Sequence, residues 1–248
     1  MEVNKCSLNL YGHSYSPEKF YNHWSWLYAL CREYLFRDHT LKISESLFPV
    51  KEPAAGTRVL EMACGPGLYT CSLARKYSQV LTTGIDLSYR LLQRAEVRAA
   101  RYSLSNCNFL LGDARAVPFD DHSFDAVVVS RLFLIVGDHE AILSEIFRVL
   151  RPGGRCFIAE PTSRVKTHLL SHVMRWMAYF FGPSDVKLSV PRNVTILSSY
   201  QFRALVASQG WSEMRFEIDG SYQFAVCSKA TQSDQEVVRS TTEAVGVA

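Results

Sequence analysis

The sequence lacks the features that would place it in several large classes of protein. No apolar run approaches the about 20 residues that a membrane-spanning helix needs, and residues 1–10 contain no continuous apolar segment of the kind found in secretory signals. The seven cysteines are odd in number and show neither Cys-x-x-Cys nor metal-finger spacing. A net charge of +3 is too small for a basic nucleic-acid-binding stripe. We therefore expect a cytoplasmic protein with reduced thiols and no metal, acting on a small molecule rather than on nucleic acid.

The length and composition are sufficient for one large core with appendages. The chain has 248 residues, of which 48% are hydrophobic. Strand and helix patterns alternate from residue 57 to 161, which predicts an α/β fold with parallel strands. We expect an N-terminal helical lid at 1–50, the main domain at 51–230 with a helical insertion at 162–197, and a disordered polar tail at 231–248.

The most informative segment is residues 59–70, Val-Leu-Glu-Met-Ala-Cys-Gly-Pro-Gly-Leu-Tyr-Thr. It is typical of a buried strand that runs through a tight glycine turn into a helix. Gly65 and Gly67 let the backbone approach a ligand that a Cβ atom would obstruct. A second apolar strand at 80–86 ends in Asp86, which is placed to bind ribose hydroxyls. Together the two segments predict a cofactor that contains adenosine.

Two residues favour S-adenosylmethionine over a dinucleotide. A dinucleotide site has a third glycine where this chain has Thr70. Glu61, inside the first strand, would repel a pyrophosphate but suits the ammonium group of a methionine moiety. Because a carboxylate in a buried strand needs a partner, we expect Glu61 to bind the methionine end of the cofactor.

Four further segments follow in an order that carries a family resemblance. They are a strand at 108–114 that closes on Asp113, a turn-rich Pro-Phe-Asp-Asp-His-Ser-Phe-Asp at 118–125, a strand at 126–130, and Glu-Ile-Phe-Arg-Val-Leu-Arg-Pro-Gly-Gly at 145–154. With the glycine turn, they resemble the class I S-adenosylmethionine-dependent methyltransferases, in particular the ubiquinone/menaquinone-biosynthesis type, over roughly residues 57–161.

The resemblance implies a fold and a cofactor site. The fold is a Rossmann-like, doubly wound seven-stranded sheet with a C-terminal antiparallel hairpin and helical lids. The cofactor is S-adenosyl-L-methionine, and the carboxylate of Asp113 accepts a hydrogen bond from the adenine amino group. The cofactor-binding residues expected on this basis are Glu61, Ala63, Gly65, Gly67, Asp86, Leu87, Asp113, Ala114 and Ser130.

Local signals predict where the elements begin and end. Ser88 and Asp138 are expected to cap helices, the first with Tyr102 on its inner face. The glycine after the helix that ends near residue 150 is expected to supply a left-handed cap. Residues 199–206 are expected to form a helix, and 213–228 a hairpin around a two-residue turn, Asp219-Gly220.

The sequence does not identify a catalytic base. Related enzymes carry histidines after the fourth strand, where this chain has Leu-Phe-Leu-Ile-Val at 132–136. The remaining candidates, all in the lids, are His13, His23, His168, His172 and Tyr21. The i, i+4 spacing of His168 and His172 permits metal binding, but without a third ligand we interpret both as solvated.

The insertion carries an apolar helical face over residues 165–181 that has to be covered. We favour a role as the roof of an apolar substrate pocket over contact with a membrane surface. The function predicted from the sequence is methyl transfer to an apolar or aromatic small molecule, with the acceptor atom and the oligomeric state open. The alternatives are a non-catalytic protein that binds S-adenosylmethionine and a methyltransferase for a membrane-dissolved prenyl lipid or quinone precursor.

Overall fold

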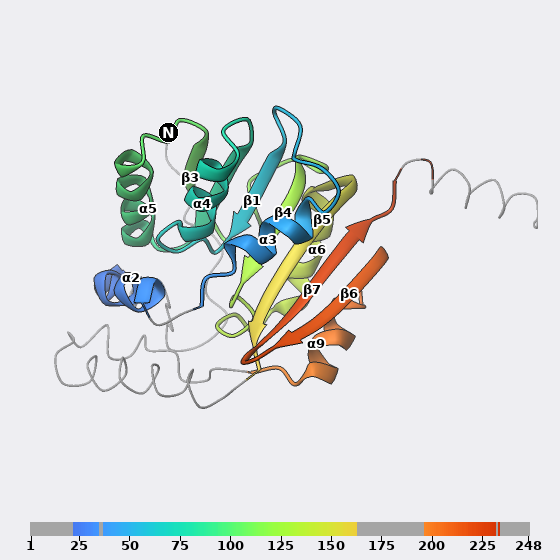
Figure 1. Cartoon of the computed structure of the whole chain (residues 1–248). Coiled ribbons are helices and arrows are strands. Elements are labelled where there is room, and N and C mark those ends of the chain that lie inside the picture. The colour runs from blue at the N-terminus through green and yellow to red at the C-terminus, as the bar shows by residue number, and fades with distance from the viewer. Residues whose placement is uncertain (1–21, 35–36, 163–195, 232, 234–248) are drawn as a thin grey trace, which may run out of the picture.

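The computed structural model describes residues 22–34, 37–162, 196–231 and 233. Figure 1 shows a single twisted sheet with helices on both faces. The helices are α2 (Ser25–Tyr34), α3 (Thr40–Leu47), α4 (Leu68–Lys76), α5 (Tyr89–Arg101), α6 (His139–Val149) and α9 (Ser199–Val206). The strands are β1 (Arg58–Met62), β2 (Leu81–Asp86), β3 (Cys107–Leu111), β4 (Phe124–Ser130), β5 (Leu150–Pro161), β6 (Trp211–Asp219) and β7 (Tyr222–Lys229).

The seven strands lie in the order β3-β2-β1-β4-β5-β7-β6. The first five strands pair in parallel, and β7 is antiparallel to both β5 and β6. The chain builds outward from β1 to β3 and then returns to the other side of β1 with β4. This reversal is the topological switch point at which open α/β sheets bind ligands, beyond the carboxyl ends of the strands. The predicted fold class is confirmed.

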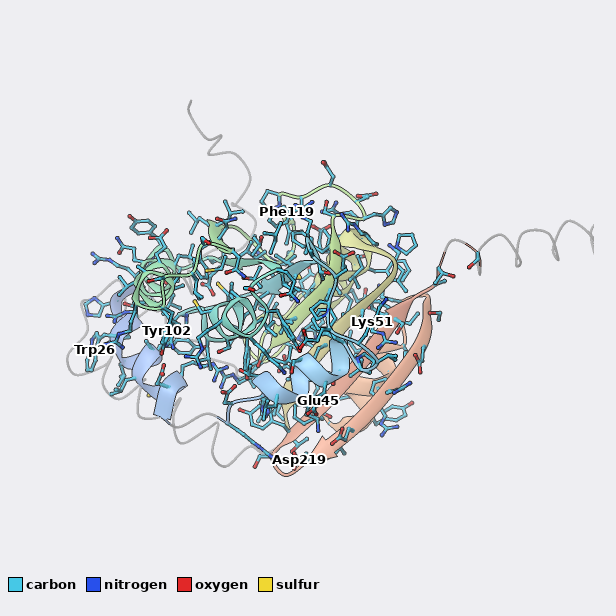
Figure 2. The ribbon with its side chains drawn as sticks, turned by 45° about the horizontal axis from the view of Figure 1, so that its top comes forward. Trp26, Glu45, Lys51, Tyr102, Phe119 and Asp219 are labelled. Carbon is cyan, nitrogen blue, oxygen red and sulfur yellow. The ribbon has the colours of Figure 1, made fainter. Side chains whose placement is uncertain are left out.

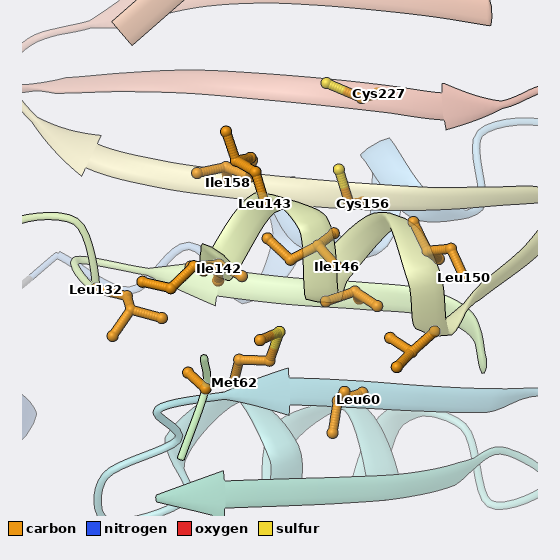
Figure 3. Packing of buried hydrophobic residues seen from close by; sticks show 14 of the residues in the cluster. Leu60, Met62, Leu132, Ile142, Leu143, Ile146, Leu150, Cys156, Ile158 and Cys227 are labelled. Carbon is orange, nitrogen blue, oxygen red and sulfur yellow. The ribbon is translucent and has the colours of Figure 1, made fainter. Parts of the chain in front are cut away.

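Two hydrophobic clusters cover the two faces of the sheet. On one face α3 and α4 pack Ile43, Tyr69 and Leu73 against β4 and β5. On the other face α6 packs Ile142 and Ile146 against β1, β4 and β5, as Figure 3 shows, and α9 joins the same cluster. β4 is the centre of the sheet, and four consecutive valine and alanine side chains there are buried on alternate faces. A fully buried parallel strand has this composition because both of its faces are covered.

Several predicted element boundaries are confirmed. Ser88 accepts a hydrogen bond from the Leu91 backbone N–H, and Asp138 accepts one from Ala141. The helix predicted at 199–206 is α9, and Ser198 begins it with a capping box. The placement of Tyr102 on the inner face of α5 was wrong: this residue follows the helix and is 42% exposed.

Two turns differ from the prediction. α6 does not end in a left-handed glycine, because Leu150 follows it in extended conformation and begins β5 directly. Gly153, with φ +76°, instead lies in an irregular part of β5, where the pairing with β4 shifts register. In the hairpin, Asp219 pairs with Tyr222, so the two-residue turn is Gly220-Ser221 and not Asp219-Gly220. Gly220 takes the required positive φ of +61°.

The described part of the N-terminal segment lies against the sheet edge to which the parallel strands point (Figure 1). The Oδ1 atom of Asn22 accepts hydrogen bonds from Ser88 Oγ and the Arg90 backbone N–H, which ties this segment to the start of α5. Trp26 projects from the outer side of α2 and is 48% exposed (Figure 2). The expected roof helix at 165–181 lies outside the described residues. Among the described helices, none is long and apolar enough to cross a membrane.

The contact of α6 with the sheet predicts a large effect of a single truncation. Ile146 is fully buried, so Ile146→Ala removes three buried carbons and should lower the free energy of unfolding by about 2–5 kcal/mol. Urea denaturation of the purified variant measures this. The matched control is Val97→Ala on α5, where the side chain is 70% exposed and the change should stay within about 0.5 kcal/mol. Equal effects of the two substitutions would contradict the assignment of α6 to the core.

Candidate functional site

The candidate site is the loop of residues 63–67 between β1 and α4. Three of its residues have left-handed backbone conformations: Ala63 with φ +55°, Gly65 with φ +54° and Gly67 with φ +69°. For alanine this conformation costs roughly 1–2 kcal/mol, which the surrounding structure has to offset. Strained residues of this kind are typical of ligand sites. The loop lies at the carboxyl end of β1, next to the switch point.

Gly67 has no room for a side chain. A Cβ atom there would lie 2.7 Å from Ala95 Cβ and 3.0 Å from the ring of Phe109. The close approach of α5 to the turn therefore depends on this glycine. Cys64 is 5% exposed, and its Sγ would lie 2.8 Å from a Cβ atom added to Gly84. Its thiol fills the space between this loop and Gly84 of β2.

Asp86 joins the end of β2 to the glycine turn. Its Oδ2 accepts a hydrogen bond of 2.8 Å from the Gly65 backbone N–H, and its Oδ1 accepts one of 2.8 Å from Ser88. Burial raises the pKa of Asp86 to about 6, although these two hydrogen bonds lower it. Each carboxylate oxygen can accept more than one hydrogen bond, so the group keeps capacity for ribose hydroxyls while it holds the turn.

Glu61 has a protein partner that the sequence did not reveal. Its Oε2 accepts a hydrogen bond of 2.7 Å from the Thr70 backbone N–H and a second from the Thr70 hydroxyl. The residue in the place of the third glycine therefore holds the acid at the start of α4. Burial raises the pKa of Glu61 to about 7 despite these bonds. A role in binding the methionine end stays a prediction, and it would involve the other oxygen, Oε1.

Asp113 follows β3, as predicted, and forms an ion pair. Its carboxylate accepts hydrogen bonds from Arg115 Nε at 3.1 Å and Nη2 at 2.6 Å. Burial alone would raise its pKa, but the hydrogen bonds from Arg115 hold the pKa of Asp113 below its ordinary value. Adenine recognition by Asp113 stays a prediction, and the adenine amino group would have to share this carboxylate with Arg115.

The other predicted cofactor residues lie along the same edge of the sheet. Leu87 follows β2 and is 37% exposed, Ala114 is buried beside Asp113, and Ser130 ends β4. Among the predicted catalytic residues, the structure describes only His23, an exposed side chain whose ring packs edge-on against Trp24. His13, His168, His172 and Tyr21 lie outside the described residues. In the described part of the chain, no group of three or more acidic, histidine or cysteine side chains could hold a metal ion.

Sequence reasoning missed a buried acid at the end of β5. Glu160 is 3% exposed, and its Oε1 accepts a hydrogen bond of 2.9 Å from the Phe133 backbone N–H in the loop after β4. Burial raises the pKa of Glu160 to about 8, although this hydrogen bond and the charge of Arg131 lower it. The signal was present in the sequence, because an acid that ends an apolar strand at 156–160 parallels Asp86 at the end of β2.

The loop after β4 is held by a second residue that the sequence analysis did not identify. His139 is half-buried, and its Nε2 lies 2.9 Å from the Phe133 carbonyl oxygen. Arg131, at the start of the same loop, has a left-handed φ of +58°. Such loop contacts join segments that are distant in sequence, so spacing alone could not predict them.

The strand order is that of the class I S-adenosylmethionine-dependent methyltransferase fold. Residues 59–154, from β1 into β5, match the family described as "Methyltransferase domain". The ubiquinone/menaquinone biosynthesis C-methyltransferase of Desulfotalea psychrophila is 34% identical over 128 residues, which are 52% of this chain and 50% of that protein. The demethylmenaquinone methyltransferase of Lactococcus lactis is 32% identical over 126 residues, 50% of each chain. The chain thus spans about half the length of the curated relatives it matches.

Solved structures show the same fold over most of the chain. The phosphoethanolamine N-methyltransferase 2 of Haemonchus contortus, in complex with S-adenosyl-L-methionine, superposes with a TM-score of 0.65. That comparison covers 87% of this chain and 60% of the other, at 14% identity. A putative S-adenosyl-L-methionine-dependent methyltransferase from Methanococcus maripaludis gives a TM-score of 0.64, covering 89% and 99% at 20% identity. At these identities the likeness supports the fold.

The buried acid Glu160 predicts a pH-dependent stability. A carboxyl group whose pKa is raised by folding stabilises the protein below its unfolded pKa, near 4.3, and loses that contribution as pH rises through the folded value of about 8. Glu160→Gln keeps the shape and the acceptor oxygen but cannot ionise. We expect urea denaturation to show the variant gaining stability relative to wild type as the pH rises from about 5 to about 8.

The control for this measurement is Glu52→Gln, which alters an exposed acid at a distance from the site. Its stability difference from wild type should not change over the same pH range. A Glu160→Gln difference that stayed constant with pH would show that the acid is ionised in the folded protein throughout.

Proposed function

We propose that this protein transfers a methyl group from S-adenosylmethionine to a small-molecule acceptor. The observation that carries the proposal is the contact between Asp86 and Gly65, 2.8 Å between Oδ2 and the backbone nitrogen, at the switch point of the sheet. A carboxylate thus lies directly beside the glycine turn, an arrangement that supports binding of ribose hydroxyls by Asp86 and a close approach of the ligand to the backbone. The family match and the curated relatives support the same activity.

The residues present fit this cofactor. Asp86 offers free acceptor capacity at the end of β2, and Gly65 and Gly67 place no side chain of their own in the turn at 63–67. Glu61 lies one strand away, with its Oε2 held by Thr70. When bound, S-adenosylmethionine supplies a methyl group on a sulfonium, which is displaced in line by a nucleophilic acceptor. The tasks left to the protein are to orient both partners and to exclude water.

We propose an apolar or aromatic acceptor. The loop after β4 carries Leu132 and Phe133, both buried, followed by the half-buried Leu134, Ile135 and Val136. Leu132 and Phe133 belong to the core cluster, and Ile135 and Val136 pack against it, so the carboxyl end of β4 is apolar where related enzymes have histidines. The names of the curated relatives concern quinones, apolar ring compounds whose reduced quinol forms are aromatic, and a membrane-dissolved prenyl lipid or quinone precursor is therefore the second candidate.

The proposal is tested first at the cofactor site. Asp86→Asn should weaken binding of adenosylhomocysteine by at least about 10-fold, because hydrogen bonds to a charged group contribute roughly 1.5–3 kcal/mol. Titration calorimetry measures the affinity, and thermal melting checks separately that the variant is folded. Asp120→Asn, an exposed acid in the loop before β4, is the control and should bind as wild type does. Unchanged affinity in Asp86→Asn would reject the assigned role.

An acceptor screen tests the activity itself. Wild-type protein, S-adenosylmethionine and a panel of aromatic hydroxyl, amine and quinol compounds are incubated, and mass detection follows both the methylated acceptor and adenosylhomocysteine. We expect an apolar aromatic compound of this panel to be methylated. Lipid acceptors dispersed in detergent are tested alongside the panel. Cofactor binding without methylation of any acceptor would favour the non-catalytic alternative. Methylation of polar amines alone would contradict the proposed apolar acceptor.

A further inference from the structure

Helix α2 buries a guanidinium that interacts with Tyr69 but whose two terminal nitrogens have no acceptor at hydrogen-bond geometry among the described residues. Arg32 is only 4% exposed, and in the described part of the chain neither its Nη1 nor its Nη2 finds an acceptor within hydrogen-bond distance. Arginine keeps its charge in proteins because its pKa lies above about 12. A buried charged donor without an acceptor is unfavourable, so this position is incomplete without an anion.

The contacts of α2 place Arg32 at the glycine turn. Its Cζ lies 4.6 Å from the centroid of the Tyr69 ring, which is in the first turn of α4, directly after that loop. Tyr28, one helical turn before Arg32, has its Cε1 3.3 Å from where a Gly65 Cβ would be. Residues four apart share one face of a helix. The face of α2 that carries Tyr28 and Arg32 therefore covers the loop at 63–67.

The groups near Arg32 do not neutralise it. Burial and the positive charges of Arg37, Arg32 and Arg131 lower the pKa of His39 to about 4, so this imidazole is neutral near pH 7. Burial raises the pKa of Glu61 to about 7, even though the charge of Arg32 lowers it, so burial disfavours the ionised form that would neutralise Arg32. Arg131 brings a second positive charge to the Tyr69 ring. Arg32 and Arg131 therefore bring two positive charges to the same region.

We propose that Arg32 is the binding residue for a carboxylate beside the glycine turn. The planar fork of a guanidinium matches the two oxygens of a carboxylate. Two ligands can bring one there: the amino-acid end of the cofactor, or an acidic acceptor. The first is favoured because Glu61 and Arg32, an acid and a base on either side of one turn, match the ammonium and carboxylate of an α-amino acid. This source rests on the proposed function, whereas the anion site itself does not.

The experiment compares two nucleosides that differ in the amino-acid group. Adenosylhomocysteine carries it, and methylthioadenosine has the same adenosine and thioether without it. Titration calorimetry is done with wild type, Arg32→Met and Arg32→Lys. We expect Arg32→Met to lose at least about 10-fold in affinity for adenosylhomocysteine and less than about twofold for methylthioadenosine, with Arg32→Lys between the two.

Arg75→Met is the matched control. Arg75 also lies over a tyrosine ring, 5.0 Å from the centroid of Tyr102, but in the last turn of α4, at the opposite edge of the sheet. Arg75→Met removes an arginine–tyrosine contact without changing the glycine turn. Its affinities for adenosylhomocysteine and for methylthioadenosine should therefore match those of wild type. Equal losses for the two nucleosides in Arg32→Met would show a purely structural role and overturn the proposal.

An acetate titration identifies the source of the carboxylate. Arg32→Met could bind adenosylhomocysteine as tightly as wild type does. In that case we expect acetate to raise the melting temperature of the adenosylhomocysteine complex of wild type but not that of Arg32→Met. This result would assign the site to the carboxylate of an acidic acceptor. The proposal is overturned if Arg32→Met matches wild type both in adenosylhomocysteine affinity and in its response to acetate. A wild-type protein that binds neither nucleoside contradicts the proposed function instead, and acetate then tests Arg32 on the free protein.

Discussion

The hydrogen bond from the Gly65 backbone to Asp86 is the constraint on which the rest of the site depends. It fixes the loop after β1 to the end of β2, and the same carboxylate anchors the start of α5 through Ser88. Two crossover helices thus begin from positions set by one side chain. Because Gly67 then brings the turn within van der Waals distance of Ala95 on α5, the strained loop has no freedom to relax. A rigid cradle of this kind loses little entropy when it binds a ligand.

Buried acids form a row along the carboxyl edge of the sheet. Glu61, Asp86 and Glu160 end β1, β2 and β5, and burial raises the pKa of each. Their partners are mostly backbone N–H groups or Thr70, not cations. The cations of the region, Arg32 and Arg131, lie above this row on α2 and on the loop after β4. Acidic side chains therefore lie near the carboxyl ends of the strands, and the two arginines lie on the segments that cover them.

Much of the fold could be predicted because its signals are local. Alternating apolar segments placed the strands, and Ser88 and Asp138 marked helix starts through hydrogen bonds within three residues. The errors at Gly153 and Gly220 were shifts in which neighbouring residue takes the turn, a choice made by strand register and not by the turn sequence alone. The glycine turn and Asp86 could be predicted because their signals are also local. The importance of Arg32 and Glu160 comes from their burial beneath segments that are distant in sequence, which the sequence alone does not reveal.

The strand order has a consequence for how the chain is made. β7, the last of the described strands in sequence, lies inside the sheet between β5 and β6, and it pairs with β5 from Arg155 to Pro161. During synthesis from the N-terminus, the whole cofactor loop and five parallel strands emerge while one long edge of β5 still has no neighbour. An open edge is a template for pairing with other chains. The nascent protein is therefore exposed to aggregation until residues 222–229 leave the ribosome, and the final strand acts as the closing step of folding.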